Sequence, residues 1–218
     1  MNDTDALLAD QVAYYRAAAA EYHLNEAAAR DLATALDQFE PAGDVLELAC
    51  GPGTWTQQLL RHAATVTAVD AAPEMLARAQ ARVGAGQVRL VQANLFEWTP
   101  QVQYDLAFFG FWLSHVPPER FDTFWTLVRA CLKPNGRVFF VDDNARTPQE
   151  VVYGEASFAI QRRLRDGTAH RAVKVSYQPA ALEQRLRRLG WLIGVTPVWG
   201  PFYYGAGAAA PSIGRDHR

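Results

Sequence analysis

The sequence predicts a doubly wound α/β fold, in which helices cover both faces of a mostly parallel sheet. Short apolar runs that are typical of strands alternate with helical patterns along most of the 218 residues. One of these runs, residues 44–49, leads directly into a glycine turn that is followed by a helix. The next apolar run ends in Asp70, where we expect the tip of the neighbouring strand. Such an arrangement is typical of α/β domains that bind nucleotide-like ligands.

The individual elements follow in order along the chain. Helical patterns at 6–20 and 24–39 precede the first strand. Strands are expected at 44–49, 65–69, 88–92, 104–109 and 137–142. Helices are expected between them at 54–61, 73–83 and 118–131, and the last of these ends before the turn Lys133-Pro134-Asn135-Gly136.

The segment from Pro148 to Tyr177 departs from this alternation. Two runs, 158–165 and 169–176, flank Asp166-Gly167, a dipeptide that favours the turn of a β-hairpin. We therefore predict an inserted hairpin lid over about 148–177, with a helix from 149 to about 164 as the alternative. The remaining elements are expected to be a helix at 179–189 and strands at 191–199 and 201–205.

Composition and length indicate one compact domain. Half of the residues are hydrophobic and a fifth are charged, so we expect a single domain over 1–205 and a flexible tail over 206–218. A net charge of −2 lacks the basic footprint of nucleic-acid binders. The only two cysteines, Cys50 and Cys131, have no disulfide or zinc spacing. The acidic start of the chain and the lack of a long apolar run predict a cytoplasmic protein that does not bind membranes. We also expect a monomer or a homodimer.

The glycine turn indicates the ligand. Gly51 and Gly53 allow backbone N–H groups to approach a bound molecule, and the following helix directs its positive end at the turn. Asp70, 17 residues after Gly53, is placed to accept hydrogen bonds from both hydroxyls of a ribose. We therefore expect an adenosine derivative.

Two further residues narrow the choice of adenosine derivative. A dinucleotide site needs a third small residue in the turn, but Thr56 occupies that position. Glu47 would repel phosphates and attract a cation. S-adenosylmethionine carries an ammonium and a sulfonium and no phosphate, so it suits this site.

At this point the sequence resembles the class I, Rossmann-like, S-adenosylmethionine-dependent methyltransferases of the small-molecule type. Their first motif, an acidic residue followed by x-G-x-G-x-G, reads here as residues 47–53, with Ala49 in place of the first glycine. The resemblance implies a seven-stranded sheet whose last strand is antiparallel, an N-terminal helical cap, and Asn94 at a position where aspartate is common. The cofactor contacts that it implies are Tyr14, Tyr22, Glu47, Ala49, Cys50, Gly51, Gly53, Asp70, Ala71, Met75, Asn94, Leu95 and Phe109.

The residues expected to contact the methyl acceptor follow the fourth predicted strand. The segment 108–118 lacks the N/D-P-P-Y/F motif of enzymes that methylate base amines or glutamine, which disfavours those acceptors. His115 is the candidate general base, with orientation of the loop or capping of the next helix as the alternative role. The expected substrate contacts are Trp112, Tyr153, Phe158 and Tyr177.

A metal ion is not expected. Asp142-Asp143-Asn144 resembles the Mg²⁺ site of catechol-type methyltransferases, but these also need an aspartate where this chain has Phe109-Gly110. We therefore interpret the chain as a methyltransferase that acts on a small, largely apolar or aromatic acceptor. The alternatives are a non-catalytic S-adenosylmethionine-binding module and a nicotinamide-dependent oxidoreductase.

Overall fold

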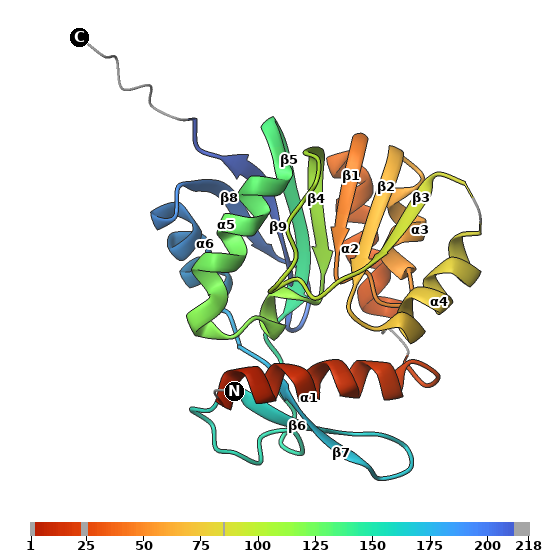
Figure 1. The fold of residues 1–218 in the computed structure, drawn as a ribbon. Coiled ribbons are helices and arrows are strands. Elements are labelled where there is room, and N and C mark those ends of the chain that lie inside the picture. Colours follow the sequence, from red (N-terminus) through yellow and green to blue (C-terminus); the bar gives the residue numbers. More distant parts are fainter. Residues whose placement is uncertain (1–2, 23–25, 85, 212–218) are drawn as a thin grey trace.

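The computed structural model describes residues 3–22, 26–84 and 86–211, and its central feature is a seven-stranded sheet. The strands are β1 (Gly43–Leu48), β2 (Ala63–Asp70), β3 (Val88–Gln92), β4 (Tyr104–Gly110), β5 (Leu132–Asp143), β8 (Trp191–Pro197) and β9 (Phe202–Ala209). They lie in the order β3-β2-β1-β4-β5-β9-β8 (Figure 1). β9 is antiparallel to both of its neighbours, and the pairs from β3 to β5 are parallel. The predicted fold class and the antiparallel last strand are confirmed.

Helices cover both faces of the sheet (Figure 1). α2 (Glu26–Phe39) and α3 (Thr54–Leu59) pack on one face, and α5 (Phe121–Cys131) and α6 (Pro179–Arg188) pack on the other. Because side chains alternate along a strand, Phe108 stacks near Phe139 in one core layer and Phe109 stacks on Phe140 in the other. α4 (Pro73–Val83) follows β2 and contacts α3. Within the described ranges, no helix has the length and apolar character needed to cross a membrane.

The inserted hairpin is present, and the alternative helix is not. β6 (Ala159–Arg163) and β7 (Ala169–Val173) pair antiparallel, and Gly167 adopts a φ of 89° in the loop between them. α1 (Asp3–Ala18) lies against this hairpin, beyond the carboxyl ends of the parallel strands (Figure 1). Leu7, Leu8 and Val173 form a small apolar cluster that joins the two elements.

Two of the expected elements differ from prediction in their local structure. The expected turn at 133–136 is a bulge inside β5, since Tyr104 pairs with Leu132 and Leu106 pairs with Arg137. The expected helix at 118–131 begins with a 3₁₀ turn, η2 (Pro118–Arg120). The start of the expected helix at 24–39 lies outside the described residues.

β9 also corrects the predicted flexible tail, because residues 206–209 belong to this strand. A Cβ on Gly205 would lie 2.2 Å from the Phe140 ring, and one on Gly207 would lie 2.0 Å from the Leu192 carbonyl oxygen. The small residues at 205 and 207 therefore allow close packing against β5 and β8. Residues 212–218 lie outside the described ranges.

Candidate active site

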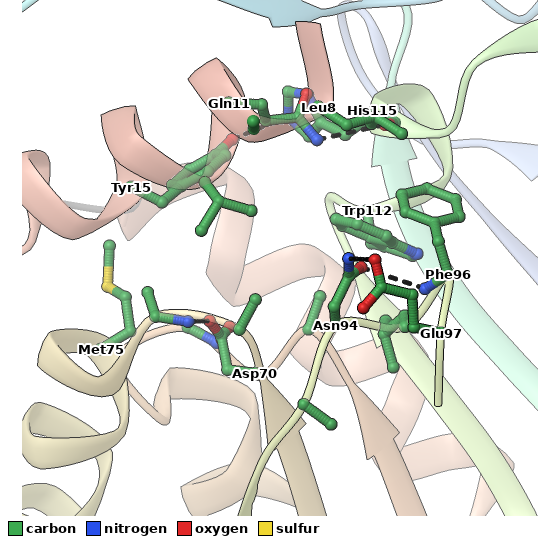
Figure 2. Close-up of a pocket in the computed structure, with 18 of the residues that line it drawn as sticks. Leu8, Gln11, Tyr15, Asp70, Met75, Asn94, Phe96, Glu97, Trp112 and His115 are labelled. Carbon is green, nitrogen blue, oxygen red and sulfur yellow. Dashed lines mark hydrogen bonds between the residues drawn. The ribbon is translucent and has the colours of Figure 1, made fainter. Parts of the chain in front are cut away.

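A cavity of about 570 Å³ lies between α1 and the carboxyl ends of the parallel strands (Figure 2). Its volume is in the range of small-molecule and cofactor sites. Figure 2 shows Asp70 and Met75 on one side of this cavity, with Tyr15 and His115 on the opposite side. The predicted site residues that line it are Tyr22, Ala49, Gly51, Asp70, Ala71, Met75, Asn94, Leu95, Trp112 and His115.

Asp70 is held in place by backbone groups on both sides. Its Oδ2 accepts a hydrogen bond of 2.8 Å from the N–H of Gly51, and its Oδ1 accepts one of 2.8 Å from Ala72. Burial raises the pKa of this carboxyl above its usual value, while the two backbone donors oppose that rise. Each oxygen keeps acceptor capacity toward the cavity, which suits a diol such as a ribose.

The two glycines of the turn have different functions. Gly51 has φ 53°, and a Cβ placed on it would meet no atom within 4 Å. Gly53 has φ 77°, but a Cβ there would lie 2.9 Å from Cα of Ala79 in α4. Gly51 therefore leaves room for a ligand, whereas Gly53 leaves room for a helix. Consistent with this difference, Gly51 lines the cavity and Gly53 does not, and Cys50, just before Gly51, also lies outside the cavity wall.

Ala49 adopts a φ of 55°, the left-handed region that favours glycine. This conformation explains why a glycine occupies the same position in the motif that the sequence resembles. Ala49 nonetheless lines the cavity, because its methyl group is small.

Glu47 lies beneath the turn and not in the cavity wall. Its side chain is buried, and its Oε2 accepts a hydrogen bond from the hydroxyl of Thr56. Burial raises the pKa of Glu47 to about 8. Thr56, the residue that interrupts a dinucleotide motif, therefore has a structural partner in Glu47. The expected contact between Glu47 and a cofactor stays a prediction.

The turn after β3 forms the other end of the cavity. Asn94 accepts a 3.1 Å hydrogen bond from the N–H of Phe96 through Oδ1 and donates a 3.1 Å bond to Glu97 (Figure 2). Its side chain therefore stabilises the turn. Glu97, which the sequence analysis missed, lines the cavity and supplies a carboxylate three residues after the position where an aspartate is common.

A second cavity of about 270 Å³ adjoins the first beneath the hairpin. Residues on α1, on the loop after β4 and just after α1 line both cavities, so the two spaces meet at these residues. The shared residues are Tyr15, Tyr22, Phe111 and His115. The second cavity is further lined by Asp143, Ala145, Thr147, Glu150, Arg162, Lys174, Pro201 and Phe202.

His115 is buried at the junction, and both of its ring nitrogens are engaged. Nδ1 faces the carbonyl oxygen of Val173, which can only accept, so Nδ1 carries the proton of the neutral ring. Nε2 therefore accepts, and the Tyr15 hydroxyl donates to it over 2.9 Å. Burial, together with the charges of Lys174 and Arg162, holds the pKa of His115 well below its usual value.

The two cations that line the second cavity, Lys174 and Arg162, differ in how fully their N–H groups are paired. The Lys174 ammonium lies 3.1 Å from Ser114 Oγ and 3.0 Å from Asp143 Oδ2, and Asp142 Oδ1 is 3.8 Å away, so two carboxylates and a hydroxyl surround this charge. One Nη of Arg162 pairs with Glu150 at 3.2 Å, but its Nε is buried and has no hydrogen-bond partner.

Asp142 and Asp143, the last two residues of β5, are therefore paired with a protein cation. Asp142 also accepts hydrogen bonds of 2.8 Å from the backbone N–H and the hydroxyl of Ser114. In the part of the chain that the structure describes, no group of three His, Cys, Asp or Glu residues is arranged to hold a metal ion.

Two expected cofactor contacts lie elsewhere. Phe109 is fully buried against Phe140 and α5, because alternation along β4 directs it away from the cavity, which Gly110 and Phe111 line instead. Tyr14 faces the hairpin, with its ring 6.0 Å from that of His170. The next helical position, Tyr15, faces the cavity together with Leu8, Gln11 and Val12 at helical spacing. This spacing was the signal in the sequence that the prediction missed.

The expected hairpin aromatics do not line either cavity. Tyr153 is 46% exposed. Phe158 packs against the cluster that joins α1 to the hairpin, and Tyr177 is buried against Phe121 with the ring centroids 5.5 Å apart. Of these rings, Phe158 helps to attach the hairpin to α1. Trp112, the fourth expected substrate contact, lines the larger cavity and not the smaller one.

Comparisons with known proteins agree with this architecture. A family model described as a methyltransferase domain matches residues 45–136. The solved structure of DhpI in complex with SAH has 42% sequence identity and a TM-score of 0.83, and the match covers 94% of this chain and 98% of that chain. DhpI has also been solved with SAM and HEP, and this structure has 41% identity and a TM-score of 0.83 over 92% of this chain and 96% of that chain.

Curated relatives match less of their own length. The ubiquinone biosynthesis O-methyltransferase of Xanthomonas axonopodis is 33% identical over 70% of this chain and 64% of its own. The trans-aconitate 2-methyltransferase of Streptomyces avermitilis is 30% identical over 67% of this chain and 56% of its own. The chain thus spans less than two thirds of the length of these relatives.

Proposed function

Because the chain belongs to the class I S-adenosylmethionine-dependent methyltransferases, we propose that it transfers the methyl group of S-adenosylmethionine to a small-molecule acceptor. The larger cavity fits the cofactor: Asp70 would hold the ribose, Gly51 leaves room beside the turn, and Asn94 and Glu97 would face the adenine. The observation on which this proposal depends most is that a second, smaller cavity adjoins the first and shares four of its lining residues.

The cofactor would supply an activated methyl group on a sulfonium, which is a good leaving group. The protein would contribute position and exclusion of water, because α1 and the hairpin cover the junction of the cavities. Holding two reactants in an aligned arrangement lowers a barrier by roughly 7–11 kcal/mol at best.

We propose an acceptor that combines an apolar or aromatic body with an anionic group. Tyr22, Phe111 and Phe202 provide aromatic walls in the smaller cavity, which agrees with the acceptor expected from the sequence. Arg162 adds a buried guanidinium with an unused donor, and such a group binds carboxylate or phosphate oxygens well. The similarity to relatives named for an organic acid, trans-aconitate, supports this acceptor class.

The test is to incubate the protein with S-adenosylmethionine and a panel of small acids, each paired with its neutral amide, and to measure S-adenosylhomocysteine. We expect release with acids and little with amides, and a loss of acid turnover in Arg162→Met. The matched control is Arg163→Met, since Arg163 is exposed on the adjacent position of β6.

Other outcomes would contradict the proposal in distinct ways. Cofactor binding without S-adenosylhomocysteine release from any acceptor would favour a non-catalytic binding module. Equal turnover of acids and amides would remove the anionic group from the proposed acceptor. Binding of NAD in preference to S-adenosylmethionine would favour an oxidoreductase.

A further inference from the structure

Tyr15 is fixed between the two cavities by contacts on several sides. Its ring packs edge-on against Tyr14, Tyr22 and His115, with centroid distances of 5.1, 6.1 and 5.7 Å. The neighbouring turn of α1 is anchored by Gln11, whose Oε1 accepts a 2.8 Å hydrogen bond from the N–H of Val173. The amide of Gln11 also donates to the carbonyl of His115 over 3.3 Å.

A chain of hydrogen bonds sets the direction of the Tyr15 hydroxyl. The Val173 carbonyl requires a proton on Nδ1 of His115, and the neutral ring then has only a lone pair on Nε2. The Tyr15 proton must therefore point at Nε2, which lies 2.9 Å away. The lone pairs of the phenol oxygen remain for whatever occupies the junction of the cavities.

An oxygen that can only accept is complementary to positive charge and to polarised C–H groups, and it opposes an oxyanion. Where the anionic oxygen of the proposed acceptor is itself the atom that is methylated, it has no proton to lose, and the transfer does not require a general base at His115. On the smaller-cavity side Tyr15 interacts electrostatically with the Arg162 guanidinium, and on the larger-cavity side we assign its contact to the positively charged part of the cofactor.

We propose that Tyr15 contacts the sulfonium methyl of the cofactor through its phenol oxygen, and that His115 is a positioning residue that holds this oxygen as an acceptor. The inference depends on the proposed function, because it requires S-adenosylmethionine in the larger cavity. It assigns Tyr15 to recognition of the charged cofactor and Arg162 to recognition of the anionic acceptor.

The predicted consequence is a preference for S-adenosylmethionine over S-adenosylhomocysteine, which lacks the charge and the methyl group. Titration calorimetry without acceptor measures both dissociation constants in the absence of turnover. In Tyr15→Phe we expect the preference to fall by roughly two- to fivefold, the scale of one or two weak C–H···O contacts. Tyr204→Phe is the matched control. Tyr204 stacks on Phe139 in a core layer and lines neither cavity, so loss of its hydroxyl should leave the preference unchanged.

A double-mutant cycle tests the positioning role of His115. His115→Leu should lower the preference as Tyr15→Phe does, and the double variant should show no further loss. Nitrogen NMR of the histidines gives an independent signal: in the wild type Nδ1 of His115 is protonated and Nε2 is not, and only the Nε2 resonance should shift in Tyr15→Phe.

Each contrary result has a defined meaning. An unchanged preference in folded Tyr15→Phe would overturn the contact between Tyr15 and the sulfonium methyl. Additive losses in the cycle, or a proton on Nε2 of His115 in the wild type, would overturn the positioning role. Failure of the wild type to bind S-adenosylmethionine would instead contradict the proposed function.

Discussion

Replacing Glu47 with glutamine should make stability less dependent on pH. Burial raises the pKa of Glu47 from 4.5 to about 8, so between these values the folded chain keeps a proton that the unfolded chain has released. Raising the pH through this interval favours the unfolded state, because that state binds fewer protons. At about 1.4 kcal/mol per pKa unit, the loss of folding free energy by pH 8 is on the order of 3–5 kcal/mol.

Chemical denaturation at several pH values across this interval measures the effect. Glutamine has no titratable proton but keeps a carbonyl oxygen that can accept a hydrogen bond from the Thr56 hydroxyl. The free energy of unfolding of Glu47→Gln should therefore lack the Glu47 contribution to its pH dependence. At high pH the variant should be more stable than the wild type. Glu155→Gln, with a side chain that is 88% exposed, is the control and should follow the wild type. Parallel slopes for the wild type and Glu47→Gln would refute the buried, protonated state of Glu47.

Three further predictions concern the cofactor cavity. Asp70→Ala should weaken S-adenosylmethionine binding by about 1.5–3 kcal/mol in calorimetry, since two charge-assisted hydrogen bonds are lost; unchanged affinity in a folded variant would place the ribose elsewhere. Gly51→Val should abolish binding with the fold largely retained, whereas Gly53→Val should lower the melting temperature because its side chain would collide with Ala79; wild-type affinity in Gly51→Val would show that the turn is not at the ligand. EDTA should leave turnover unchanged, and activity that is lost to EDTA and restored by Mg²⁺ would overturn the metal-free site.

Features that depend on nearby residues could be predicted from the sequence. The strand, glycine turn and Asp70 lie within one β-α-β unit, so their spacing alone predicted a shared cavity. Asp166-Gly167 predicted the hairpin because only a few residues decide the conformation of a turn.

Features that depend on tertiary orientation could not be predicted as well. Tyr14 and Tyr15 are adjacent tyrosines on one helix, and the packing of α1 against the hairpin decides which of them reaches the cavity. The sequence did not indicate Arg162 as a site residue. Its proximity to His115 results from the fold of the long insertion between β5 and α6. The small residues of β9 suggested a flexible tail, although they allow close packing of Phe140 and β8.

The most direct test of the proposed two-cavity arrangement is an experimental structure of the protein with S-adenosylhomocysteine. We predict the ribose at Asp70, the adenine beside Asn94 and Glu97, and the sulfur at the junction beside Tyr15, facing the smaller cavity. A sulfur atom directed away from that cavity, or a cofactor bound outside the space between α1 and the sheet, would contradict the proposed path of methyl transfer.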